Sequence, residues 1–166
     1  MSVSANVSAR IGRSSTFWVV AWVVLCGCGE ADRTLSIATG GPAGLYYPFG
    51  GGMASVWSKQ LTEVNVKAEV TGGSITNVTQ VARMESDLGI AMADVTTDAF
   101  LGQGLFEQAL PLRVLFTAYP NIVHILTLED SGIAAVADLR GKRVALGAQG
   151  SGTAVAAANV LRGLGV

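Results

Sequence analysis

The segment Gly147–Thr153, GAQGSGT, has residue types that could bind an anion. It follows the apolar run 143–146 and precedes an alanine-rich stretch that is typical of a helix. A strand, a glycine turn and a helix start together expose backbone N–H groups and the positive end of the helix dipole. Gly147 and Gly152 match the outer glycines of a phosphate-binding P-loop, but Thr153 stands where that loop needs lysine. The segment therefore predicts an anion site that is not a P-loop.

Similar breaks follow three earlier apolar runs, LSIAT, VKAEV and LGIAM. Gly40 and Gly41 follow the first run, and a glycine pair with Ser74 follows the second. Three of the four breaks run directly into an expected helix. In parallel α/β sheets, ligands sit beyond the carboxyl ends of the strands. We therefore expect one ligand site that is built from several helix N-termini.

The hydrophobic pattern alternates between strand-like and helix-like segments. This order predicts an α/β fold with a mostly parallel sheet and right-handed crossovers. The expected strands are 35–39, 65–70, 88–92, 112–118, 122–127 and 144–146. The expected helices are 47–61, 74–84, 94–101 and 154–164, with a short helical turn within 131–139.

Several polar side chains at these turns are candidates for ligand binding. Ser74, Ser151 and Thr153 can donate hydrogen bonds to an anion, although Ser74 and Thr153 could also serve only as helix caps. Tyr46 and Tyr47 follow the first turn and could either pack in the core or cover a ligand with a hydroxyl at hand.

Two further candidates are Asn77, which lies one turn into the helix expected at 74–84, and Asp94. Asn77 is three residues after Ser74, so both side chains could face the cleft. Asp94 begins the helix expected at 94–101, where it could cap the helix or pair with a ligand ammonium group.

Enzyme motifs are not supported by this sequence. The one histidine, His124, lies in the apolar run IVHIL, and Gln149 stands where a G-x-S-x-G elbow around Ser151 needs glycine. A dinucleotide fold needs G-x-G-x-x-G, and the spacing of Gly40, Gly41 and Gly44 does not fit. We predict a protein that holds a ligand without transforming it, with no catalytic residue, no metal and no cofactor.

The first 28 residues are typical of an export signal. Arg10 and Arg13 precede the apolar run FWVVAWVVLC, which is too short to span a bilayer comfortably. The sequence Leu25-Cys26-Gly27-Cys28 resembles a bacterial lipobox, which predicts lipidation at Cys28. Ordinary signal cleavage is the alternative. A zinc site at the two cysteines is disfavoured because the chain has a single, distant histidine.

Composition excludes some classes of partner. The 166 residues carry a formal net charge of -1, and only 14% are charged. Without a basic face or a run of Lys and Arg, nucleic acid is not an expected partner.

Four segments carry a resemblance to a known family: TGGPAGLYYPFGG, VTGGSITNV, DLGIAMADVTTDAFLG and DSGIAAVADLRGKRVALGAQGSGT. In this order they resemble the signature segments of the TAXI family of TRAP-transporter solute receptors. The resemblance covers about residues 35 to 166. It implies a periplasmic binding protein type II-like fold and a small carboxylate or amino-acid solute, such as glutamate, glutamine, a dicarboxylate or a 2-oxoacid. The positions that match the family are Gly40, Gly41, Tyr46, Tyr47, Ser74, Asn77, Asp94, Ser151 and Thr153.

The resemblance also implies the organisation of the chain and its surroundings. Residues 1–28 are the expected lipoprotein signal peptide, 29–34 a tether and 35–120 the first lobe. Residues 121–166 are expected to be the hinge strand and the start of an incomplete second lobe, because receptors of this family are longer. The implied place is the periplasm or another extracytoplasmic site, with a lipid anchor and TRAP permease subunits as partners. The alternatives are a nucleotide-utilising α/β enzyme and a truncated remnant that binds nothing.

Overall fold

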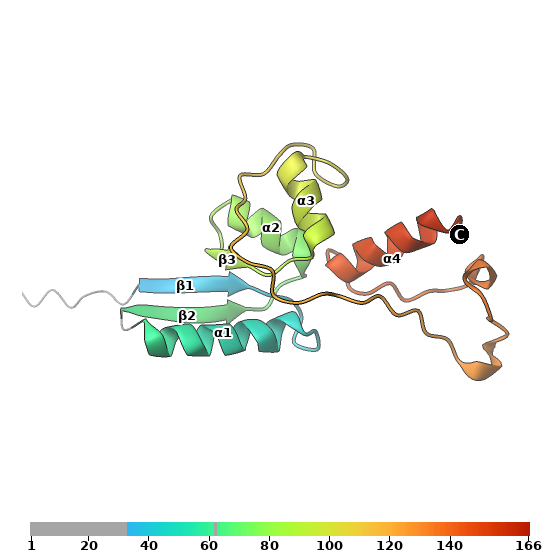
Figure 1. The fold of residues 1–166 in the computed structure, drawn as a ribbon, viewed down its shortest axis with the longest axis horizontal. Coiled ribbons are helices and arrows are strands. Elements are labelled where there is room, and N and C mark those ends of the chain that lie inside the picture. The colour runs from blue at the N-terminus through green and yellow to red at the C-terminus, as the bar shows by residue number, and fades with distance from the viewer. Residues whose placement is uncertain (1–32, 62) are drawn as a thin grey trace, which may run out of the picture. The chain divides into compact units, whose positions relative to one another are not determined.

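A parallel sheet is the framework of the described chain, which comprises residues 33–61 and 63–166 of the computed structural model. Strands β1 (Arg33–Ala38), β2 (Val64–Glu69) and β3 (Leu88–Gly89) lie in the order β2-β1-β3 (Figure 1). All the pairings are parallel. The predicted α/β class is therefore confirmed. The expected signal peptide, Cys28 and most of the tether lie outside the described residues, and β1 begins within the expected tether.

Four α-helices lie close to where the hydrophobic pattern predicts them, with ends that differ by at most two residues. Short 3-10 turns occupy part of the region for which a short helical turn is expected. None of the helices in the described residues is both long and apolar enough to cross a membrane. The helical elements are α1 (Tyr46–Gln60), α2 (Ser74–Ala82), α3 (Ala93–Leu101), η1 (Glu129–Ser131), η2 (Val136–Leu139) and α4 (Gly152–Gly163).

Two apolar clusters form the core, and one of them packs α1 against the sheet while the other joins α2 and α3. In the first, Ile37 of β1 and Val66 of β2 pack against Ala54 of α1, because alternate strand residues face that helix. In the second, Val78 of α2 and Val95 of α3 are both almost fully buried. Figure 1 shows α1 next to β2, and α2 and α3 on the β3 side. The carboxyl ends of the three strands are thereby surrounded by helix starts.

Three predicted strands are not present in the described part of the chain. Residues 112–118, 122–127 and 144–146 lack strand partners, and no backbone hydrogen bond joins 113–127 to another segment. Large apolar side chains stay exposed there, with Leu115 71% and Leu126 87% accessible. The apolar pattern is correct for strands, but a strand is stable only when a neighbour pairs with its backbone. The lobe boundary after residue 120 stays a prediction.

The helix α1 approaches the end of β1 very closely at a glycine. A Cβ atom added to Gly50 would lie 2.5 Å from Thr39 Cγ2 and 3.3 Å from Ile90 Cδ1. By contrast, a Cβ added to Gly52, in the same helix, would meet no atom within 4 Å. The glycine at position 50 is therefore required by packing, and the one at position 52 is not.

We expect Gly50→Ala to lower the free energy of unfolding by about 1–3 kcal/mol, since overpacking forces the helix away from β1. The matched variant Gly52→Ala should raise it by about 0.5–1 kcal/mol, because alanine restricts the unfolded chain and favours the helix. Urea unfolding followed by circular dichroism measures both. Equal effects of the two variants would contradict the close approach of α1 to Thr39.

Candidate functional site

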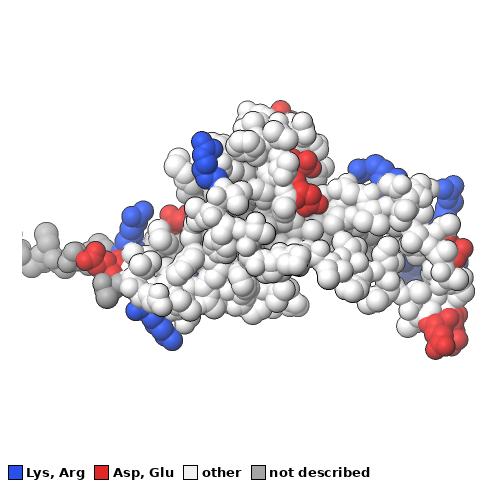
Figure 2. Space-filling model, viewed as in Figure 1, with Lys and Arg blue, Asp and Glu red and all other residues white. Residues whose placement is uncertain are grey.

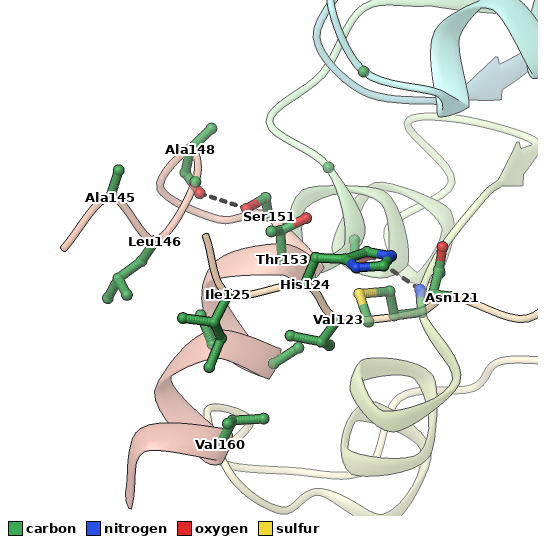
Figure 3. A pocket seen from close by; sticks show the side chains of 18 of the residues that line it. Asn121, Val123, His124, Ile125, Ala145, Leu146, Ala148, Ser151, Thr153 and Val160 are labelled. Atoms are coloured by element: carbon green, nitrogen blue, oxygen red, sulfur yellow. Dashed lines mark hydrogen bonds between the residues drawn. The ribbon is translucent and has the colours of Figure 1, made fainter. Parts of the chain in front are cut away.

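A cavity of about 910 Å³ lies at the carboxyl ends of the strands, where the glycine turns meet (Figure 3). The first two glycine turns and Met92 form one side of it. Most of the segment 119–127, which we call the link, and residues 143–148 form other parts of the wall. The start of α4 completes it, so the glycine turns before α1, α2 and α4 meet at one cavity.

Three helices begin at this cavity. Tyr46 of α1, Ser74 of α2 and Gly152 of α4 are each the first residue of their helix, and all three line the cavity. A helix start carries about half a positive charge from the aligned peptide dipoles. The cavity therefore has a positive electrostatic contribution from the backbone alone. Some of the backbone N–H groups at these helix starts already have protein partners, because Ile75 N–H donates to the Gly150 carbonyl at 3.1 Å.

The glycines next to α2 and α4 allow these two helix starts to touch. Gly73 has φ of +109°, which side chains rarely tolerate, and a Cβ there would lie 3.1 Å from Ser151 Cα. A Cβ on Gly152 would lie 2.5 Å from both Ser74 Oγ and Met92 Sδ. The glycine motifs therefore serve close packing between the two turns, besides opening the backbone to a ligand.

The two serines at these helix starts already have protein partners. The Ser74 hydroxyl is fully buried and accepts a hydrogen bond from Met92 N–H at 3.1 Å. The Ser151 hydroxyl accepts from Ala154 N–H at 3.1 Å and donates to the Ala148 carbonyl at 2.7 Å. Ser151 is thus the cap of α4. The expected capping role of Ser74 is wrong, because Gly73 holds the cap position and the serine hydroxyl joins α2 to the start of α3 instead.

Asn77 ties the ends of all three strands together. Its side-chain amide donates to the carbonyl groups of Thr39 and Ile90, both at 2.6 Å, and its oxygen accepts from Thr71 Oγ1 at 2.5 Å. These partners follow β1, β3 and β2 respectively. Asn77 has no exposed surface and does not line the cavity, so its place differs from the expected one facing the cleft.

The remaining candidates divide between the cavity and the outer surface. Tyr47 is exposed outside the cavity. Asp94 lies in the first turn of α3, also outside the cavity, and its carboxylate accepts from Val95 N–H at 2.8 Å. The expected cap position of Asp94 is wrong, because α3 begins one residue earlier, after Met92. The candidates that do line the cavity are Gly40, Gly41, Tyr46, Ser74, Ser151 and Thr153.

Sequence reasoning missed several polar residues of the cavity wall. Tyr119, Asn121 and His124 lie on the link, and Figure 3 labels Asn121 and His124 among the residues around the cavity. Arg143 is the single Lys or Arg among the described lining residues, and no Asp or Glu occurs among them. Arg143 stands four residues before Gly147, in the segment that leads into the glycine turn, and this proximity was an available signal.

One titratable group of the cavity wall has a shifted pKa. Burial raises the pKa of the Tyr119 phenol above its usual value, and the nearby Tyr46 raises it further.

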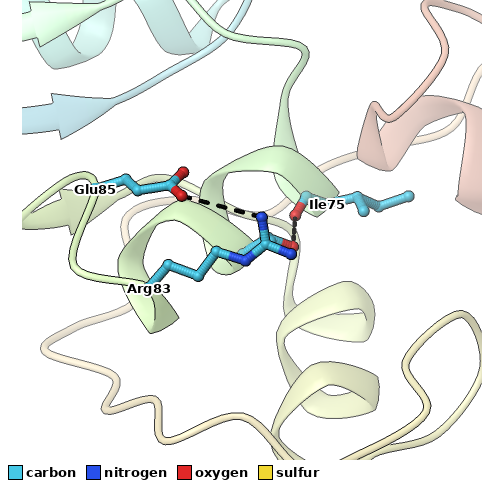
Figure 4. Close-up of polar contacts among 4 residues, drawn as sticks. Ile75, Arg83 and Glu85 are labelled. Carbon is cyan, nitrogen blue, oxygen red and sulfur yellow. Dashed lines mark hydrogen bonds and ion pairs between the residues drawn. The ribbon is translucent and has the colours of Figure 1, made fainter.

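On the outer surface, Arg83 and Glu85 pair at 4.0 Å (Figure 4). Both side chains are exposed, so this pair adds little stability. Figure 2 shows such charges scattered over a mostly uncharged surface.

A comparison with protein-family models gives a match to the NMT1-like family over residues 37–166. The chain belongs to this family. The NMT1-like family comprises periplasmic solute-binding proteins, so the solute-binding role predicted from the sequence is confirmed at this level. Members of the NMT1-like family are binding proteins and typically extracytoplasmic. The narrower resemblance to TAXI receptors stays a prediction.

We expect Asn77→Ala to lower the free energy of unfolding by about 3 kcal/mol, because two carbonyl groups and one hydroxyl would lose their partner. Asn159 of α4 is exposed, so Asn159→Ala is the matched control and should stay within about 0.5 kcal/mol of the wild type. Chemical denaturation of both variants measures the difference. Similar stability for the two variants would show that Asn77 does not hold the strand ends together.

Proposed function

We propose that this chain is the extracytoplasmic receptor of a TRAP-type transporter and that it binds a small carboxylate. The solutes we expect are glutamate, glutamine, a dicarboxylate or a 2-oxoacid. The class of transporter rests on the resemblance of the four glycine-containing segments to TAXI receptors. The preference for an acid rests on the charges around the cavity.

The observation that carries the proposal is the one-sided charge of the cavity wall. Three helix starts and Arg143 contribute positive potential, and the described lining residues include no carboxylate to oppose it. A carboxylate is stabilised by such a surrounding, whereas a cationic solute would find no counter-charge. Thr153, which is exposed at the start of α4, adds a hydroxyl for which no protein partner is formed in the described chain.

Apolar side chains line much of the rest of the wall, where they can contact the carbon chain of a solute. Ile125, Leu146 and Val160 are among these apolar residues (Figure 3). Binding of this kind combines few polar contacts that fix orientation with an apolar surface that excludes water.

We expect Arg143→Ala to weaken binding of the acid roughly 10-fold, the lower end for a hydrogen bond to a charged group, because Arg143 is exposed to solvent. The neighbouring Lys142 does not line the cavity, so Lys142→Ala is the matched control and should bind normally. Isothermal titration calorimetry with a panel of amino acids, dicarboxylates and 2-oxoacids measures the affinities.

The same panel should contain uncharged amides of the acids, together with ATP and NAD. Stronger binding of an amide than of its acid would contradict carboxylate selection. Tight nucleotide binding without acid binding would instead favour the α/β enzyme that the sequence leaves open. Equal losses in the Arg143 and Lys142 variants would mean that general surface charge, and not the cavity, attracts the solute.

A lipid anchor at Cys28 completes the proposal. The motif Leu25-Cys26-Gly27-Cys28 after an apolar run supports it, and such an anchor would keep the receptor next to its membrane transporter. We expect Cys28→Ala to abolish incorporation of a labelled fatty acid in cells, whereas Cys26→Ala should keep it. Equal label in wild type and Cys28→Ala would exclude lipidation at this residue.

A further inference from the structure

Tyr119 joins the link to helix α1 through its aromatic ring. The ring packs edge-on against Phe49, with 5.4 Å between the ring centroids and 76° between the planes. Phe49 lies three residues after Tyr46 in α1, so both side chains lie on the same face of that helix. Edge-to-face packing is one of the favourable arrangements of two aromatic rings. The ring of Tyr119 is therefore well placed in the structure.

The hydroxyl of Tyr119 is less well placed than its ring. The oxygen is covered by other atoms and has no hydrogen-bond partner among the described residues. The other covered polar atom without a partner in the described chain, Gln80 Oε1, belongs to α2 and lies outside the cavity. Leaving a buried hydroxyl unpaired is unfavourable. Any rearrangement that gives Tyr119 a partner is therefore favoured by this group.

A partner is close by. Tyr46 lies one helical turn before Phe49, against which the Tyr119 ring packs, so its side chain is on the face of α1 that Tyr119 contacts. Asn121, two residues further along the link, donates its side-chain N–H to the Tyr46 hydroxyl at 3.4 Å, a distance long for such a bond. All three side chains line the cavity. One loose contact and one missing contact thus occur at the same junction between the link and α1.

We propose that Tyr119 is a positioning residue of the solute site: its hydroxyl pairs with the Tyr46 hydroxyl when a solute fills the cavity, and the pair then holds the link against α1. This inference rests on the proposed function. The link supplies much of the cavity wall and has no backbone hydrogen bond to another described segment, so a small shift of it toward a solute needs no strand to separate. The same shift moves Tyr119 and Asn121 relative to α1.

The Tyr119–Tyr46 pairing contributes to affinity because it exists in the solute-bound protein and not in the free protein. A ligand shifts a conformational equilibrium by as much as it stabilises one state over the other. A hydrogen bond that forms only in the bound state adds to that difference. In the free protein the unpaired hydroxyl slightly lowers the stability.

The variant Tyr119→Phe separates these two states, because it keeps the ring packed on Phe49 and removes only the hydroxyl. We expect the thermal unfolding midpoint of the free protein to be unchanged or about 1–3 °C higher. We expect the affinity for the best acid of the panel to fall about 3- to 10-fold, the range for one uncharged hydrogen bond. Tyr47→Phe is the matched control, since Tyr47 is exposed outside the cavity, and it should change neither quantity.

Tyr46→Phe and the double variant complete the measurement by calorimetry. The double variant should lose no more affinity than Tyr46→Phe alone, because both single variants remove the Tyr119–Tyr46 bond and Tyr46→Phe also removes the Asn121 contact. Normal affinity in Tyr119→Phe, additive losses, or a clearly lower unfolding midpoint of the free variant would each overturn the pairing. If the wild type binds none of the acids, the proposed function fails and the pairing fails with it; an acid that binds wild type and Tyr119→Phe equally overturns the pairing alone.

Discussion

The side-chain amide of Asn77 is the interaction on which the arrangement of the site depends. It is fully buried and binds residues that follow each of the three strands, Thr39, Thr71 and Ile90. Two donors and one acceptor are used at once, a combination that neither aspartate nor a hydroxyl side chain can supply in the same place. Because each strand end leads into a turn, and the turns lead into helix starts, fixing the strand ends also fixes where α1, α2 and α3 begin. The positive ends of α1 and α2, two of the three that line the cavity, are therefore held by a residue that does not itself line it.

The contact between the turns at α2 and α4 has an electrostatic cost for the site. Gly73 and Gly152 let the two helix starts touch, and the Gly150 carbonyl then takes the Ile75 N–H of α2. Ser151 likewise takes Ala154 N–H of α4. Amides used in this way are no longer free for an anion, although the helix dipoles remain. Under the proposed function, an acid would thus depend on the dipoles, the remaining amides and Arg143 together. This explains why a glycine-rich turn before a helix, taken alone, is weak support for a particular ligand.

The sequence predicted the parts of the fold that local patterns determine. The hydrophobic patterns of 35–39 and 74–84 were sufficient for β1 and α2, since each pattern follows from the geometry of one element. Residues 112–118 and 122–127 have an equally good strand pattern, yet they remain unpaired in the described chain, because pairing depends on a partner that no local pattern reveals. The site was predictable as a meeting of turns. The separate roles of Ser74, a tie to Met92, and of Asn77, a tie between strands, depend on residues distant in the sequence and could not be predicted from spacing.

Because the link has no strand partner, it forms a less rigid wall of the cavity than the glycine turns do. The wall formed by the glycine turns is held by the Asn77 bonds, by Ser74 and by two apolar clusters, so moving it would disrupt several buried interactions at once. The link has no comparable backbone bonds, and its side chains Ile122 and Leu126 are mainly exposed. Segments with few buried contacts and few backbone hydrogen bonds are the ones that move at low cost in free energy. Under the proposed function, a ligand that contacts both walls would therefore leave the first two glycine turns in place and shift the link.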